Sequence, residues 1–147
     1  MLKLRQMIAD DYDAVYSLWL KTPGMGLNDV DDSRAGITKY LSRNPGTCFV
    51  AEDDEQIVGV ILAGHDGRRG YIHHACVAVR HWNSHIGTRL VGAAVGALRA
   101  EGITKVAMVV FRRNERGNGF WQRLGFTDRP DLVYRDRALA ELRRMDT

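Results

Sequence analysis

A polar loop between an apolar run and an amphipathic stretch is the part of this sequence best suited to chemistry. Residues 75–79 have the composition of a buried strand, and helical periodicity begins at Ile86-Gly87-Thr88. A strand that enters a helix through a short loop leaves backbone N–H groups free at the helix start, beside the positive end of the helix dipole. The pattern therefore predicts a site for a ligand that carries phosphate groups.

Two adjacent histidines, His73 and His74, precede this run and are candidates for proton transfer. A neutral imidazole near pH 7 suits a general base or a water relay. Because successive side chains of a strand point to opposite faces, we expect one ring to face the site and the other to face away, and we favour His74 for the site. The alternative is that both are ordinary sheet residues. Tyr71 and Tyr134 are candidates for a general acid that would donate a proton in the same site.

The remaining titratable residues argue against metal and redox chemistry. The five histidines lack the cysteine or carboxylate spacing of a metal site, so we expect no metal. Cys48 and Cys76 lie in apolar runs and are interpreted as reduced, buried thiols.

Charge and composition limit the partners. The formal charge is +3, with arginines concentrated in the C-terminal third. This arrangement fits a solvated surface, or a basic rim that attracts a polyanionic small molecule. The sequence has no nucleic-acid recognition motif, no signal peptide and no membrane-spanning run. We therefore expect a cytoplasmic protein without nucleic-acid or membrane partners.

The elements that must position these residues follow one another in an α/β order. Strands are expected over residues 2–8, 47–52, 57–63, 71–79 and 103–111, with a final strand region from Phe126 through 132–134. Helices are expected over 11–20, from a cap at Asp32 or Ser33 to 43, over 85–100, and from a cap at Asn114 to 124. Gly92 and Gly96 are expected to pack against the sheet. Residues 138–145 fit an edge strand or a frayed helix.

The connections predict the sheet. Turns join the second, third and fourth strands as an antiparallel meander, whereas helix 85–100 joins strands 71–79 and 103–111 as a parallel crossover. The fold class is therefore α/β (α+β): one domain, residues 1–147, with a mixed, mostly antiparallel sheet, one parallel step and flanking helices. Strands diverge at such a step, and open sheets bind ligands in that kind of crevice.

This order of elements, with these residues, resembles the GNAT superfamily of N-acetyltransferases. The resemblance covers essentially the whole chain, most strongly residues 47–126. It rests on residues 49–52, 57–60 and 71–79, on 86–90, on Asn114, and on Phe120-Trp121 with 124–126. It implies a GNAT-like fold and transfer of an acetyl group from acetyl-CoA to a primary amine of a small molecule, peptide or protein, by direct attack in a ternary complex. The resemblance leaves the oligomeric state open, with a homodimer as one of the assemblies it allows.

The resemblance implies a donor site on particular residues. The strand pairs with the pantetheine arm, the loop amides hold the pyrophosphate, and Asn114 contacts the arm. The implied cofactor-binding residues are Cys76, Val77, Val79, Asn83, Ser84, His85, Ile86, Gly87, Thr88, Asn114 and Trp121. For acetyl transfer, the catalytic candidates are His74, His73 and Tyr134.

The sequence departs from the family pattern at four positions. Val79 stands where a proline is expected shortly after the strand. Trp82 stands where Arg or Gln is usual, His85 where glycine is usual, and Trp121 where a tyrosine often protonates the leaving thiolate. The loop thus keeps one glycine, Gly87, and loses a cation. Two functions remain open: an N-acetyltransferase, or a degenerate, non-catalytic acyl-CoA-binding or regulatory module.

Two further groups of charges are candidates for the site. Arg112 and Arg113 end the parallel strand and are candidates for a phosphate contact. Acidic residues between the first two helices are candidates to meet a cationic amine, with helix capping as the favoured alternative: Asp29, Asp31 and Asp32.

Overall fold

A five-stranded sheet in the order β1-β2-β3-β4-β5 forms the centre of the molecule. The computed structural model describes residues 1–145. The strands are β1 (Leu2–Gln6), β2 (Phe49–Asp53), β3 (Gln56–His65), β4 (Gly70–Val77) and β5 (Val106–Met108). The first four pair antiparallel, and β5 pairs parallel with β4. The expected mixed sheet with one parallel step is confirmed.

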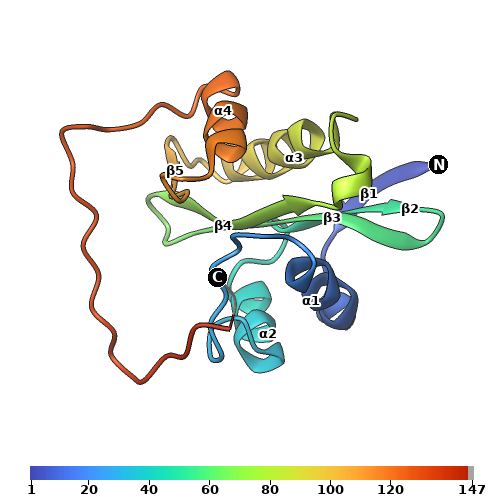
Figure 1. Cartoon of the computed structure of the whole chain (residues 1–147), viewed down its shortest axis with the longest axis horizontal. Coiled ribbons are helices and arrows are strands. Elements are labelled where there is room, and N and C mark those ends of the chain that lie inside the picture. The colour runs from blue at the N-terminus through green and yellow to red at the C-terminus, as the bar shows by residue number, and fades with distance from the viewer. Residues whose placement is uncertain (146–147) are drawn as a thin grey trace.

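Helices cover both faces of the sheet (Figure 1). One face carries the 3-10 turn η1 (Ala9–Asp11), α1 (Tyr12–Leu20) and α2 (Arg34–Arg43); the other carries α3 (Ile86–Ala100) and α4 (Glu115–Arg123), with the 3-10 turn η2 (Val79–His81) before α3. Within residues 1–145, no helix combines the length and apolar character needed to cross a membrane.

The two faces make two hydrophobic cores that share β3. Val60 and Leu62 pack against the α1 side, whereas Ile61 and Ala63 pack against the α3 side. This alternation is the period of two that a strand imposes, and it explains why β3 is apolar almost without interruption.

Caps and glycines define how the helices meet the sheet. Ser33 caps α2 by accepting the Gly36 N–H, so of the two expected caps the serine is used. The expected packing role of Gly92 and Gly96 is wrong, because an added Cβ would meet nothing within 4 Å at either position. The close approach occurs at Gly59 of β3, where a Cβ would lie 2.9 Å from Leu90 Cδ1.

A β-bulge in β4 sets the direction of the two histidines. Ile72 pairs with Ala63 and His74 pairs with Leu62, so His73 is one extra residue opposite that step. One extra residue reverses the alternation beyond it. Ile72 therefore packs on the α3 side, whereas the His74 ring packs on Trp19 of α1.

The expectation that His73 and His74 face opposite sides of the sheet is therefore wrong. The His73 ring contacts Tyr40 of α2, on the same side as His74. The bulge also explains why β5 is shorter than expected: pairing of β4 with β5 ends at Ile72–Met108, one residue before the bulge. Beyond that pair the backbone segments that continue β4 and β5 separate.

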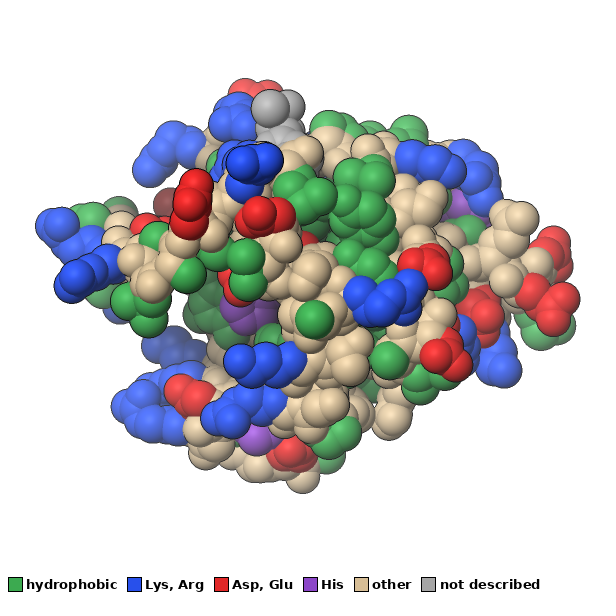
Figure 2. Space-filling model, turned by 90° about the horizontal axis from the view of Figure 1, so that it is seen from below, with side chains coloured by type: hydrophobic (Ala, Val, Ile, Leu, Met, Phe, Trp, Pro, Cys, Tyr) green, Lys and Arg blue, Asp and Glu red, His purple; other side chains and the backbone are tan. Residues whose placement is uncertain are grey.

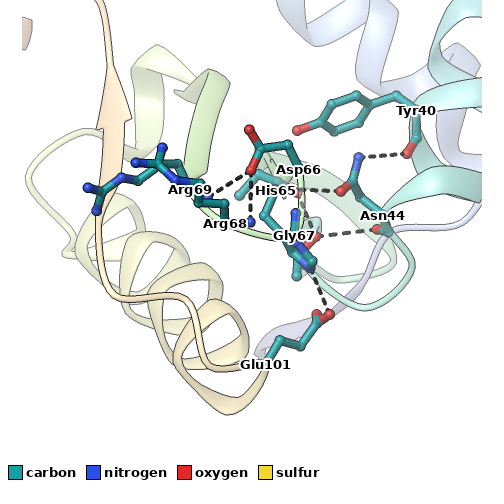
Figure 3. Close-up of polar contacts among 10 residues, drawn as sticks. Tyr40, Asn44, His65, Asp66, Gly67, Arg68, Arg69 and Glu101 are labelled. Atoms are coloured by element: carbon teal, nitrogen blue, oxygen red, sulfur yellow. Dashed lines mark hydrogen bonds and ion pairs between the residues drawn. The ribbon is translucent and has the colours of Figure 1, made fainter.

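The hairpin that begins β4 is tied to helices on both faces (Figure 3). The N–H of Gly67 donates to Nδ1 of His65, so Nε2 carries the proton and donates to Oε1 of Glu101 over 2.8 Å. Asn44, at the end of α2, accepts the N–H of His65 over 2.9 Å. These contacts hold the turn between β3 and β4 in place.

The final strand expected from Phe126 through 132–134 is wrong. Between residues 124 and 145 the chain has no regular helix or strand, and it travels away from the body as a wide loop (Figure 1). Pro130 lacks a backbone N–H, and Leu132 and Val133 are 60% and 75% exposed, so this segment has no burial to offset ordering.

The end of the described chain returns to the segment between α1 and α2. Of the two alternatives for residues 138–145, neither a helix nor a full strand forms; an isolated antiparallel bridge joins Asn28 and Arg144. The Asp29 N–H donates to the Arg143 carbonyl over 3.1 Å, and the Met145 N–H donates to the Leu27 carbonyl over 2.9 Å.

Candidate active site

An open cleft of about 2010 Å³ follows β4 where β5 separates from it. Its walls come from the segment between α1 and α2, from β4, from the loop before α3, and from β5 and α4. Seen from the α1–α2 side, histidine lies in the depression beside the projecting tail, with Lys and Arg side chains around it (Figure 2). The basic rim expected from the sequence includes Lys39, Arg43, Arg112, Arg116, Arg137 and Arg144.

The backbone of β4 forms one wall of the cleft. The Ala78 N–H donates to the Val58 carbonyl of β3 over 2.8 Å. Because strand backbone groups alternate, the groups of Cys76 also face β3, whereas those of Ala75 and Val77 face the side that β5 has left. Ala75 and the N–H of Val77 thus offer backbone groups to an extended ligand, whereas the Val77 carbonyl already accepts the Trp82 Nε1–H.

Two other predicted strand residues contribute less. The Cys76 side chain is buried against the α1 core, and burial raises the pKa of its thiol to about 12. Burial likewise raises the pKa of Cys48 to about 11, and both cysteines are free. Val79 lies in η2, is 52% exposed and does not line the cleft.

The loop before α3 keeps the backbone shape that glycines would allow. Asn83 and His85 both have φ of 67°, in the left-handed region. His85 is the N-cap of the 15-residue helix α3, and no described side chain caps that helix start. The amides of its first turn, which include those of Gly87 and Thr88, are therefore available to a ligand. This is a loop that fits phosphate groups.

Gly87 lies in close contact with α4 at this helix start. A Cβ on Gly87 would lie 3.1 Å from Cζ of Phe120, on α4. Ile86 is buried beneath the helix start, and Ser84 donates its hydroxyl hydrogen to the His81 carbonyl. Ser84 and Ile86 thus shape the loop, and their side chains are committed within it.

The Trp82 side chain is held by a hydrogen bond and by stacking. Its Nε1–H donates to the Val77 carbonyl over 2.9 Å, and the Arg116 guanidinium lies over the ring, 4.0 Å from its centroid. Nη2 of Arg116 is 3.4 Å from Oδ1 of Asn83. The sequence prediction missed Arg116, although its place two residues after the α4 cap puts it in the first turn of that helix.

Asn114 and Trp121 line the cleft but have structural partners. Asn114 caps α4 by accepting the Gly117 N–H over 2.9 Å. The Trp121 ring is buried and packs edge-on against Phe120 and Phe126, each with centroids 5.1 Å apart. An indole N–H can only donate a hydrogen bond and cannot replace a phenol as an acid near neutral pH.

His74 and Asp32 form a buried pair on the other wall. Nε2 of His74 lies 2.7 Å from Oδ1 of Asp32, and the side chains are 12% and 6% exposed. Because a carboxylate accepts, Nε2 carries the proton and Nδ1 keeps the lone pair. Oδ2 of Asp32 accepts the Asn28 N–H over 2.8 Å. Asp32 is therefore a partner of His74, a role that the sequence prediction missed.

His73 lies in the cleft beside two tyrosines. Its ring is 4.6 Å from that of Tyr71 and 5.3 Å from that of Tyr40. Partial desolvation by the cleft walls is the main cause that lowers the pKa of His73, and the nearby His74 is the second. The ring remains accessible from the cleft. His73 is thus held in its neutral form at pH 7.

Tyrosine hydroxyls border the same space. Burial, and secondarily Tyr134, raises the pKa of Tyr71. Tyr134 lines the cleft from the tail and is 67% exposed. Within residues 1–145, no cluster of three or more His, Cys, Asp and Glu side chains has the arrangement of a metal site.

Sequence comparisons place relatives over most of the chain. A model described as the acetyltransferase (GNAT) family matches residues 12–126. Acetyltransferase ECA0875 of Pectobacterium atrosepticum is 27% identical over 125 residues, which are 85% of this chain and 87% of the relative. Acetyltransferase plu1384 of Photorhabdus laumondii is 27% identical over 132 residues, 87% and 88% of the two chains.

Solved structures share the fold at low identity. Ard1 from Thermoplasma volcanium has a TM-score of 0.77 and 19% identity, covering 86% of this chain and 82% of its own. PaiA N-acetyltransferase from Thermoplasma acidophilum, solved in complex with coenzyme A, has a TM-score of 0.74 and 14% identity, covering 84% and 88%.

Proposed function

The chain belongs to the acetyltransferase (GNAT) family, and from this premise we propose that it acetylates a primary amine by direct attack on the thioester in a ternary complex. Its acyl donor is acetyl-CoA. The observation that carries the proposal is the pairing of His74 with a buried Asp32 on the cleft that also receives the free amides of α3.

The donor fits the wall made by β4 and α3. The backbone groups of Ala75 and the N–H of Val77 would pair with the amide-bearing pantetheine arm, and the amides of Gly87 and Thr88 would hold the diphosphate. When bound, acetyl-CoA supplies an activated acyl group. The side chains on this wall serve to shape the backbone, so binding here depends on the loop conformation.

The acceptor amine would lose its proton on the opposite wall. A protonated amine is not a nucleophile, so a base must take a proton before or during attack. Nδ1 of His74 is the nitrogen with a lone pair, and the carboxylate of Asp32 would stabilise the imidazolium that forms. A placed base contributes about 10²- to 10⁴-fold to a rate.

A tyrosine would then return a proton to the leaving thiolate. We propose Tyr134, which lines the cleft and contributes to the raised pKa of Tyr71. His73, neutral at pH 7 and next to Tyr71, would relay protons between the two walls. The acceptor is a small molecule or a peptide or protein amine.

The proposal is tested by thiol release and by binding together. We expect the purified protein to bind acetyl-CoA in isothermal titration and to release coenzyme A with at least one amine from a panel of small amines and peptide N-termini. Binding without release for any amine would support the non-catalytic alternative instead. That alternative is favoured by the Trp82 Nε1–H, which occupies the Val77 carbonyl. No binding at high micromolar concentration would contradict the proposed function.

A further inference from the structure

We propose that Arg116 supplies the phosphate-binding cation that the loop before α3 lacks, and that Trp82 positions its guanidinium for the diphosphate of coenzyme A. The inference rests on the proposed function, because it concerns the same donor site. It assigns a role to a residue of α4 that lies 34 positions away in sequence from the loop position it serves.

Trp82 is a fixed surface rather than a free side chain. The Nε1–H bond to the Val77 carbonyl ties the indole to the end of β4. A guanidinium stacked on an indole is attracted to the ring face and keeps its planar edge for hydrogen bonds. The 4.0 Å distance from the Arg116 carbon to the ring centroid is a close contact of this kind. Trp82 thus holds a cation where its own side chain provides none.

Arg116 is held on a rigid part of the molecule. Asn114 caps α4, and Nδ2 of Asn118 donates to the carbonyls of Phe111 and Asn114 over 3.0 and 2.8 Å. These bonds fix the first turn of α4, which carries Arg116. The site therefore has a preformed cation rather than one that must be recruited from solvent.

The charge of Arg116 is available to an anion. Among residues 1–145, no carboxylate forms an ion pair with it, and its hydrogen bond in the loop is to the neutral Asn83 amide over 3.4 Å. A guanidinium has five donors in a planar fork that matches phosphate oxygens. Asn83, with φ of 67°, is part of the loop whose amides face the same ligand. The Arg116 guanidinium, the Asn83 side chain and the loop amides together match a diphosphate.

The test compares ligands that differ in their phosphates. Arg116→Ala should weaken binding of coenzyme A and of 3′-dephospho-coenzyme A by the same factor, about tenfold, in isothermal titration. Steady-state kinetics should show a higher KM for acetyl-CoA with little change in kcat, and an unchanged kcat/KM with S-acetylpantetheine, which has no diphosphate. Arg99→Ala, which removes an equal charge at the other end of α3, is the matched control and should bind coenzyme A normally.

The role of Trp82 is tested through Arg116. Trp82→Ala should lose part of the affinity, Trp82→Phe should restore most of it by keeping a ring face, and Trp82→Ala should add little once Arg116 is removed. Additive losses in the double variant would show that Trp82 does not act through Arg116.

The outcomes separate this inference from the proposed function. Wild-type affinity in both Arg116→Ala and Arg116→Gln would overturn the inference and leave the proposed function intact. A loss for coenzyme A without a loss for its 3′-dephospho form would assign Arg116 to the other phosphate and also overturn it. Failure of the wild-type protein to bind coenzyme A would contradict the proposed function and, with it, this inference.

Discussion

The two walls of the cleft are built in different ways. The donor wall is mostly backbone from one continuous segment, residues 77–88, with α4 packed on it. The acceptor wall is made of side chains from separate parts of the chain, Asp32 before α2 and His74 in β4, and the buried Trp19 of α1 packs behind His74. A backbone site tolerates changes of side chain that a side-chain site does not. This difference explains how the loop keeps its shape with His85 where glycine is usual.

The largest effect is expected on the acceptor wall. We predict that His74→Ala lowers kcat by about 10²- to 10⁴-fold, because it removes the proposed base, while affinity for acetyl-CoA changes little. Steady-state kinetics and isothermal titration measure the two quantities separately. Asp32→Asn should lower kcat less, since the imidazole remains but loses its carboxylate. An unaltered kcat in His74→Ala would remove this residue from the mechanism.

Substitutions in the donor wall should change the affinity for acetyl-CoA, whereas those in the acceptor wall change kcat. We predict that Gly87→Asp weakens acetyl-CoA binding by about 100-fold, because its Cβ meets Phe120 at 3.1 Å and its charge opposes the phosphates. Titration calorimetry is the measurement, and thermal unfolding checks that the variant is folded. Unchanged affinity in a folded Gly87→Asp protein would mean that the phosphates bind elsewhere.

A pH-dependent test concerns the support of α1, the helix whose Trp19 packs against His74. Asp11 is buried, which alone would raise its pKa, but hydrogen bonds from Arg5 and from the Ile8 N–H together lower that pKa below its ordinary value. A lowered pKa means that the pair stabilises the fold above about pH 4, the unfolded value, and that this stability is lost as the pH falls through the folded-state pKa.

We therefore predict that Asp11→Asn lowers the free energy of unfolding by about 2 kcal/mol at pH 7, and that the difference from wild type shrinks below about pH 4. Urea denaturation at a series of pH values measures this. Asp13→Asn is the control: Asp13 pairs with Arg34 at the surface, so its loss should cost under about 1 kcal/mol. A pH-independent difference for Asp11→Asn would contradict the assignment.

The smallest effect is expected where α3 faces solvent. An added Cβ at Gly92 meets nothing, so Gly92→Ala should raise the free energy of unfolding by about 0.5–1 kcal/mol through helix propensity. Donor affinity should stay at the wild-type value, which makes this variant the matched control for Gly87→Asp in the same helix. Destabilisation would indicate that Gly92 packs against a partner.

Local patterns were enough to predict the antiparallel meander, the parallel step and the four helices, because each depends on short-range periodicity or on a turn. They were insufficient for the histidines: the bulge at His73 depends on its pairing with β3, and strand alternation alone predicted the wrong face. Arg116 and Asp32 act through contacts between distant segments, 33 and 42 residues apart. The prediction of a final strand in the tail was wrong for another reason. Its apolar residues suggested a strand, but they gain no burial in the fold.

The return of the tail to the segment between α1 and α2 connects the end of the chain with the proposed base. Residues 143–145 hydrogen bond to residues 27–29, the Asn28 N–H holds Asp32, and Asp32 holds His74. A C-terminal purification tag, or an expression clone that stops before residue 143, would therefore disturb the imidazole indirectly, through Asn28 and Asp32. Assays of this protein are best made with an N-terminal tag that is removed.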